Sequence, residues 1–134
     1  MDDLYRDEIL EHYRNPRNFG TLEHADAVSE GANPLCGDRI TLMLGIGDGG
    51  TIEEVAFTGR GCAISQASAS MLTDEIKGKQ LDEIARLGRE DVLETLGIEI
   101  SPARLKCALL SLQTLRQALA ERVVWQASTD ETAR

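Results

Sequence analysis

The sequence predicts a single α+β domain, in which a small antiparallel sheet is covered by about five helices. Residues 39–46 alternate apolar and polar side chains, as a half-buried strand does. A glycine-rich segment follows and leads into a second β-rich run, which is the pattern of a hairpin. After residue 58, apolar residues recur instead at helical spacing. A chain of 134 residues, 42% of them hydrophobic, suits one domain with its own core.

The strands follow from this alternation. Apolar residues occupy every second position from Ile40 to Ile46, and Gly47-Asp48-Gly49-Gly50 supplies residues that tolerate positive φ. Residues 51–58 are therefore expected to return as an antiparallel strand. A third strand is expected over about residues 25–31.

Helices are expected at both ends of the sequence and between the last strand and the C-terminus. The first covers about residues 2–13, with an apolar stripe at Tyr5, Ile9 and Tyr13, and Asn15-Pro16 ends it. The second covers residues 62–76, where many Ala and Ser side chains permit close packing on the sheet. Shorter helices are expected at residues 81–87 and 90–96, each closed by a glycine, Gly88 and Gly97.

The last helix is expected to be long. Ser101 is suited to the N-cap and Pro102 to the first helical position. Its buried face is marked by Leu105, Ala108, Leu112, Leu115 and Leu119. We expect one domain over residues 1–125, and a disordered polar tail over residues 126–134.

Composition excludes several classes of function. With 14 basic and 23 acidic residues, the net charge of -9 and the lack of a basic run argue against a nucleic-acid partner. Apolar stretches are shorter than the ~18 to 20 residues of a membrane span, and the acidic start is unlike a signal peptide. We therefore expect no membrane partner and a cytoplasmic location. Three cysteines are an odd number, which favours reduced thiols over disulfides.

Each cysteine falls at the end of a predicted element. Cys36 lies in a Pro/Gly turn before the clearest strand, and Asp38 follows two residues later. If residues 36–38 are extended, both side chains face the same way and can reach one ion. Cys62 lies at a strand-to-helix junction, where the helix N-terminus and Arg60 favour a thiolate. Cys107 lies in the second turn of the last helix beside Lys106, a cation able to lower a thiol pKa.

These positions predict one metal site, but an alternative remains open. Cysteine is often simply buried, and the spacings here lack the paired CxxC pattern of common zinc sites. By the same reasoning Asp38 can be a turn residue, and Arg60 and Lys106 solvated cations. The two histidines, His12 and His24, are interpreted as surface residues.

A resemblance favours the metal site. Four segments, at residues 12–18, 33–38, 59–65 and 103–107, read HYRNPRN, NPLCGD, GRGCAIS and ARLKC. Together they resemble the IscU/SufU family, the NifU N-terminal-like iron-sulfur cluster assembly proteins. The resemblance extends from about Leu4 to Ala120.

The resemblance implies a three-stranded antiparallel sheet with helices packed on it, in agreement with the pattern above. It also implies a role with a cysteine desulfurase, from which family members take persulfide sulfur. They then either build a transient [2Fe-2S] cluster from sulfur and iron for apo iron-sulfur proteins, or relay the sulfur with bound zinc. An iron donor and chaperones are further partners implied. Cys36, Cys62 and Cys107 would be the thiolate ligands and Asp38 the oxygen ligand.

Two features divide the branches of the family. IscU-type members carry a histidine before the last cysteine and a chaperone motif nearby, whereas this chain has Lys106 and the sequence SPAR. SufU-type members insert a segment between the second and third cysteines, for which the 45-residue interval from Cys62 to Cys107 leaves no room. Whether the protein follows the IscU or the SufU pathway, and whether it depends on a chaperone, stay open.

Three hypotheses follow, in order. The first is a scaffold for iron-sulfur cluster assembly that is mainly non-enzymatic, and the second is a zinc-dependent sulfurtransferase. Cys107 is the expected persulfide acceptor and Cys36 the alternative, because the attacking thiol must be accessible and ionised. The third is a cysteine-nucleophile enzyme, which would require a histidine beside a thiol.

Overall fold

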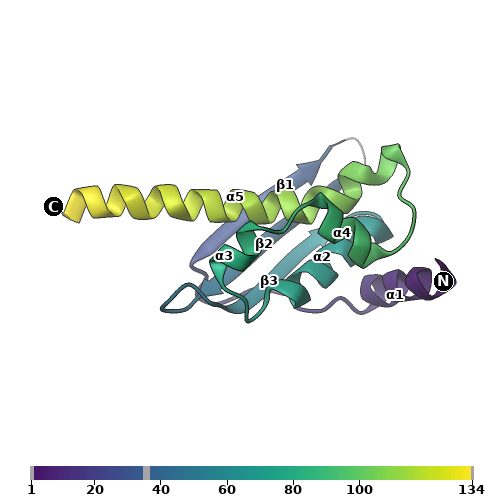
Figure 1. Cartoon of the computed structure of the whole chain (residues 1–134), viewed down its shortest axis with the longest axis horizontal. Helices are drawn as coiled ribbons and strands as arrows, with labels where there is room; N and C mark the ends of the chain where they lie inside the picture. Colours follow the sequence, from purple (N-terminus) through teal and green to yellow (C-terminus); the bar gives the residue numbers. More distant parts are fainter. Residues whose placement is uncertain (1, 35–36, 134) are drawn as a thin grey trace.

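The computed structural model describes residues 2–34 and 37–133, with side chains described for residue 4, residues 6–34 and residues 37–120. Its elements are α1 (Asp2–Arg14), β1 (Ala27–Asn33), β2 (Asp38–Ile46), β3 (Ile52–Arg60), α2 (Ala63–Ile76), α3 (Leu81–Ala85), α4 (Arg89–Leu96) and α5 (Pro102–Ala133), as Figure 1 shows. The predicted α+β class, with three antiparallel strands and five helices, is confirmed for the described residues.

The strands form an antiparallel sheet in the order β1-β2-β3. Asn33 pairs with Asp38 and Arg39 pairs with Arg60. The end of β1, the start of β2 and the end of β3 therefore meet at one end of the sheet. The chain enters α2 from that same end, directly after β3.

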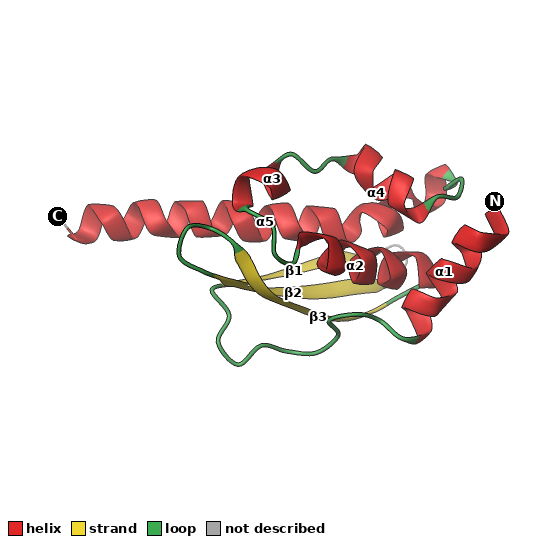
Figure 2. Ribbon diagram, turned by 60° about the horizontal axis from the view of Figure 1, so that its bottom comes forward, coloured by secondary structure: helices red, strands yellow, loops and turns green. Residues whose placement is uncertain are grey.

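Helices cover one face of the sheet, as Figure 2 shows for α2 and α5. The main core lies between these layers, where Phe57, Leu44 and Ile76 are fully buried. The predicted alternation in β2 holds for Ile40, Leu42 and Leu44, at 1%, 3% and 0% exposed. Met43 on the opposite face is also buried, so that part of β2 is covered on both faces.

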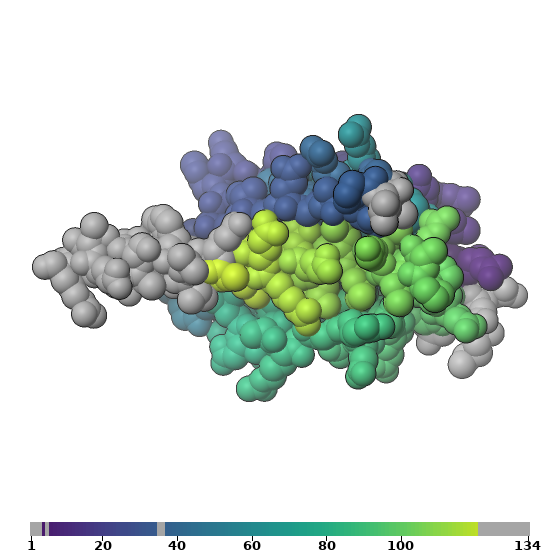
Figure 3. All heavy atoms as spheres, turned by 90° about the horizontal axis from the view of Figure 1, so that it is seen from above, coloured from purple at the N-terminus to yellow at the C-terminus, as the bar shows by residue number. Residues whose placement is uncertain are grey.

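The first part of α5 packs directly on β1. A side-chain carbon at Gly31 would lie 2.1 Å from Thr114 Oγ1, so only glycine allows this approach. In the space-filling view of Figure 3, α5 forms a green ridge between the blue strand β1 and the teal helices α3 and α4. No helix in the described part of the chain is both long and apolar enough to cross a membrane.

Helix α1 contacts α2 through a buried apolar side chain and through a polar contact. Ile9 is buried in a second cluster with residues of α2, α4 and α5. The interpretation of His12 as a surface residue is wrong: its side chain is 9% exposed, and its Nδ1 lies 2.7 Å from Ser70 Oγ. Tyr13, which was expected on the apolar stripe, is 45% exposed, because the buried face of α1 is narrower than the predicted stripe.

Several boundaries differ from those predicted: β1 covers Ala27–Asn33 rather than about residues 25–31, and β3 covers Ile52–Arg60 rather than residues 51–58. Gly88 does not close α3, which ends at Ala85; Gly88 is the N-cap of α4, and its N–H donates to Asp91 Oδ2 at 2.8 Å. Gly97 closes α4 in the left-handed conformation, as predicted. Helix α5 extends to Ala133. The predicted end of the domain at residue 125 and the predicted disordered tail at residues 126–134 both stay predictions.

Candidate metal centre

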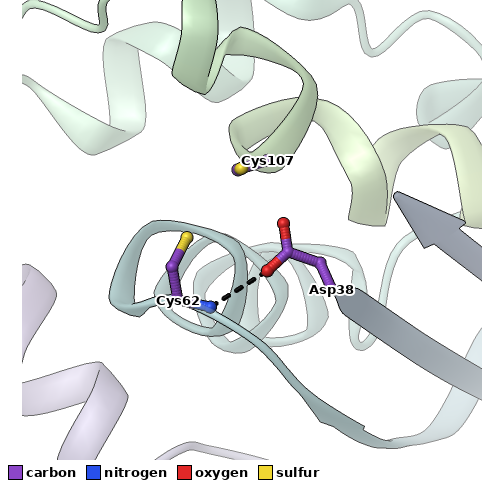
Figure 4. Close-up of side chains that lie close together, drawn as sticks. All are labelled: Asp38, Cys62 and Cys107. Atoms are coloured by element: carbon purple, nitrogen blue, oxygen red, sulfur yellow. Dashed lines mark hydrogen bonds between the residues drawn. The ribbon is translucent and has the colours of Figure 1, made fainter. Parts of the chain in front are cut away.

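The shared end of the sheet brings together three of the four predicted ligands. Asp38 is the first residue of β2, Cys62 is the N-cap of α2, and Cys107 lies in the second turn of α5. One ligand atom from each lies within 4.8 Å of the others. Figure 4 shows the Asp38 carboxylate and the Cys62 sulfur on the side that faces Cys107. Cys36, the fourth predicted ligand, lies outside the described residues.

The two oxygens of Asp38 have different surroundings, although the whole residue is only 1% exposed. Oδ1 accepts the backbone N–H of Cys62 at 3.0 Å and lies 3.2 Å from Ser65 Oγ. Oδ2 is buried and has no hydrogen-bond partner among the described residues. A buried carboxylate oxygen without a partner is costly in an apo protein, and it is the atom that a cation would satisfy.

The two thiols differ in exposure. Cys107, which was expected to be an accessible thiol, is instead fully buried, and Asn33 Nδ2 donates to its sulfur at 3.7 Å. Cys62 is half-buried, and its sulfur lies 3.9 Å from Ser65 Oγ. The cationic side chains predicted to favour thiolates, Arg60 and Lys106, are exposed. Carboxylate and thiols thus converge from three separate elements.

The family profile described as the NifU-like N terminal domain matches residues 4–126 of this chain. The chain belongs to this family. The resemblance inferred from the four short segments is therefore confirmed across nearly the whole sequence.

Individual relatives agree with this family. The zinc-dependent sulfurtransferase SufU of Bacillus subtilis (strain 168) is 40% identical over 138 aligned positions, which cover 90% of this chain and 92% of that protein. The iron-sulfur cluster assembly scaffold protein IscU of Escherichia coli (strain K12) is 35% identical over 120 positions, covering 87% and 92%. Among solved structures, an assembly scaffold protein for the SUF system from Fervidobacterium islandicum AW-1 has a TM-score of 0.71 and 30% identity, covering 84% and 94%.

The donor set of this NifU-like domain fits a metal. Tetrahedral zinc with Zn–S distances of about 2.3 Å places its sulfur ligands ~3.8 Å apart. The ligand atoms of Asp38, Cys62 and Cys107 lie within 4.8 Å of one another. Each pair of atoms therefore has to move closer by only about 1 Å or less to reach the spacing of a zinc site. Thiolates are the soft ligands that zinc and iron-sulfur units prefer.

Sequence reasoning assigned no role to three residues around the predicted ligands of this NifU-like domain, although the quoted segments at residues 33–38 and 59–65 contain them. Ser65 contacts Asp38, Asn33 contacts Cys107, and Gly61 lets the backbone approach both Asp38 and Ser65. The signal for Ser65 was its spacing, three residues after the N-cap Cys62, which points a side chain back to the helix start. Asn33 carried no comparable local signal, because its partner is 74 residues away.

Proposed function

We propose that this NifU-like domain is a scaffold for iron-sulfur cluster assembly. It accepts persulfide sulfur from a cysteine desulfurase, together with iron and with electrons from an external reductant that convert this sulfur to sulfide, and builds a labile [2Fe-2S] cluster for transfer to apo iron-sulfur proteins in the cytoplasm. The observation that supports this most is the convergence of Asp38, Cys62 and Cys107, with a buried oxygen on Asp38 that has no hydrogen-bond partner in the described part of the chain. Cys36, two residues before Asp38, is the proposed fourth ligand.

The residue types suit temporary binding. In sulfur transfer, an acceptor thiolate attacks the outer sulfur of the desulfurase persulfide, one S–S bond forms as another breaks, and the desulfurase cysteine leaves as thiolate. The carboxylate of Asp38 is a harder ligand than thiolate and exchanges more readily on an iron-sulfur unit. A scaffold that must release its cargo benefits from one such exchangeable position.

A second candidate is a zinc-dependent sulfurtransferase. Two observations favour it: the 40% identity to a relative named for that activity, and Lys106 in the position before Cys107. In this case Asp38 and the cysteines would hold zinc at rest, and a thiol displaced from the zinc would take the sulfur. The cysteine-nucleophile enzyme loses support, because the ring of His12 is hydrogen-bonded to Ser70 rather than placed beside a thiol.

The test is metal analysis and absorption spectroscopy of protein purified without oxygen, for wild type and for Cys36→Ser, Cys62→Ser and Cys107→Ser. Wild type should bind metal stoichiometrically, and each substitution should abolish this, because losing one soft ligand opens a four-coordinate centre. A cluster spectrum after reconstitution with desulfurase, cysteine, iron and a thiol reductant supports the scaffold, and zinc alone supports the sulfurtransferase. Wild-type protein that binds neither a cluster nor zinc would overturn both the scaffold and the sulfurtransferase proposals. A cysteine whose loss leaves affinity unchanged is a packing residue.

A further inference from the structure

The two carboxylate oxygens of Asp38 differ in their hydrogen bonding, and this difference bears on which of them would bind a metal. A carboxylate oxygen has two lone-pair positions. Oδ1 has two donors within reach, the Cys62 N–H at 3.0 Å and the Ser65 hydroxyl at 3.2 Å. Both lone pairs of Oδ1 therefore face donors inside the protein, although the single Ser65 proton is shared between Oδ1 and the Cys62 backbone oxygen at 3.1 Å. Oδ2 is buried and unpartnered among the described residues.

We propose that Ser65 is a positioning residue that fixes Asp38 as a one-oxygen ligand through Oδ2. The inference rests on the proposed metal site. Ser65 is fully buried at the start of α2, so its hydroxyl cannot exchange its contacts for water. Besides Asp38, it reaches the backbone oxygen of Cys62 at 3.1 Å, accepts from Gln66 Nε2 at 3.4 Å and lies 3.9 Å from the Cys62 sulfur. One hydroxyl thus contacts two of the predicted ligands.

Gly61 supports the same assignment independently. A side-chain carbon at this position would lie 2.2 Å from Asp38 Oδ1 and 2.7 Å from Ser65 Oγ. Its φ of +152° is also one that other residues rarely adopt. The backbone is thus shaped to let the hydroxyl and Oδ1 meet. A carboxylate held in this way presents one oxygen, and remains the weakest and most exchangeable corner of the site.

The test uses Ser65→Ala, with Ser65→Thr as the variant that keeps the hydroxyl and Ser70→Ala as a matched control. Ser70 is a fully buried serine of the same helix whose hydroxyl contacts His12 and Arg17 at the junction with α1. Ser65→Ala should weaken zinc affinity about 10- to 100-fold, the usual effect of removing the partner of a ligand. Its Co(II)-substituted form should show altered d–d absorption, because the freed carboxylate can rotate. Ser65→Thr should restore both, and Ser70→Ala should lower only thermal stability.

A double-mutant cycle shows whether Ser65 acts through Asp38. In an Asp38→Ala background, Ser65→Ala should cause no further loss of zinc affinity, since the residue it positions is gone. Wild-type affinity and Co(II) spectrum in Ser65→Ala would overturn the inference, and so would equal losses with and without Asp38. Failure of wild type itself to bind metal is a different result, which overturns the proposed function.

Discussion

Cys107 and Asp38 are the two residues whose surroundings bear most directly on sulfur transfer and release. Cys107 is fully buried beside Asn33, whereas Cys62 is half-buried. Asp38 has a hydrogen bond at Oδ1, whereas its Oδ2 has no partner among the residues that the structure describes. For a reactant to reach either residue, the surrounding helices and strands therefore have to move apart.

We predict that Cys107 receives the persulfide. Because its sulfur is buried, a desulfurase must open the site before transfer, so labelling of Cys107 should require the desulfurase and be slow with a small-molecule persulfide. Incubation with desulfurase and cysteine, followed by peptide mass analysis, should locate the added sulfur. Exclusive labelling of Cys36 would contradict the prediction and support the zinc-linked relay.

For Asp38, we predict slower cluster release on removal of the carboxylate. Asp38→Ala removes the exchangeable ligand, but it also removes the acceptor for the Cys62 N–H at the start of α2. Asp38→Asn separates these effects, because its amide oxygen can keep that bond while its NH₂ group replaces Oδ2 as a non-ligand. Both variants should assemble a cluster and transfer it to apo-ferredoxin more slowly, as followed by circular dichroism.

Thermal melts of the two apo forms provide the control for folding. Asp38→Asn should melt close to wild type, and Asp38→Ala at a lower temperature, because an unpartnered buried N–H costs about 1–3 kcal/mol. If Asp38→Asn folds normally and transfers clusters at the wild-type rate, Asp38 is not the release point.

At the scale of elements, the junction between α1 and α2 is expected to respond to pH. Burial lowers the pKa of His12 from its ordinary 6.5, and the nearby Arg17 lowers this pKa further. Ser70 Oγ accepts the Arg17 N–H at 2.7 Å, which leaves its hydroxyl proton for a neutral His12 Nδ1. Protonated His12 cannot accept that bond at Nδ1, so acid should weaken the attachment of α1.

The sign of the pH effect follows from proton uptake. As pH falls through 6.5 toward the lowered pKa, the unfolded chain binds a proton that the folded state resists, so stability should decrease. His12→Gln should remove this part of the pH dependence in urea unfolding experiments. His24→Gln should keep it, because His24 is exposed. An unchanged pH dependence in His12→Gln would show that other groups cause it.

The contact between β1 and α5 is a second element-scale feature, and it also positions Cys107. Gly31→Ala places a carbon where Thr114 Oγ1 now lies, and such overpacking costs about 1–3 kcal/mol. Zinc affinity should fall as well, because α5 carries one ligand. Thr114→Ala in the same chain removes the obstacle and should restore most of the stability. Denaturant unfolding of the four proteins in this cycle measures the effect, and a Gly31→Ala protein as stable as wild type would contradict it.

For the whole molecule, metal binding and folding should be coupled, because the described ligands come from β2, α2 and α5. Zinc at about 100 times its dissociation constant should stabilise the folded state by about 2.7 kcal/mol. Chelator-treated protein should therefore melt at a lower temperature than zinc-loaded protein. Cys62→Ser should lose this zinc-dependent increase. Ser70→Ala should keep the increase, although its melting temperature without zinc should be lower than that of wild type. An equal increase in Cys62→Ser would place the zinc elsewhere.

The sequence alone determined the element order, the single antiparallel sheet and the identity of Asp38, Cys62 and Cys107 as candidate ligands. Each of these rests on a local signal: alternation from Ile40, glycines at the turns, or a cysteine at an element's end. Such signals work because strand and helix periods repeat over a few residues. The family resemblance then added the roles that spacing alone left open.

Only the tertiary structure decided how the site is supported. Ser65 meets Asp38 across 27 residues, Asn33 meets Cys107 across 74, and His12 meets Ser70 across 58. These pairs depend on the packing of α1, α2 and α5 rather than on any local pattern. Burial likewise depends on that packing, which is why His12 proved buried and why one oxygen of Asp38 is hydrogen-bonded while the other has no partner among the described residues.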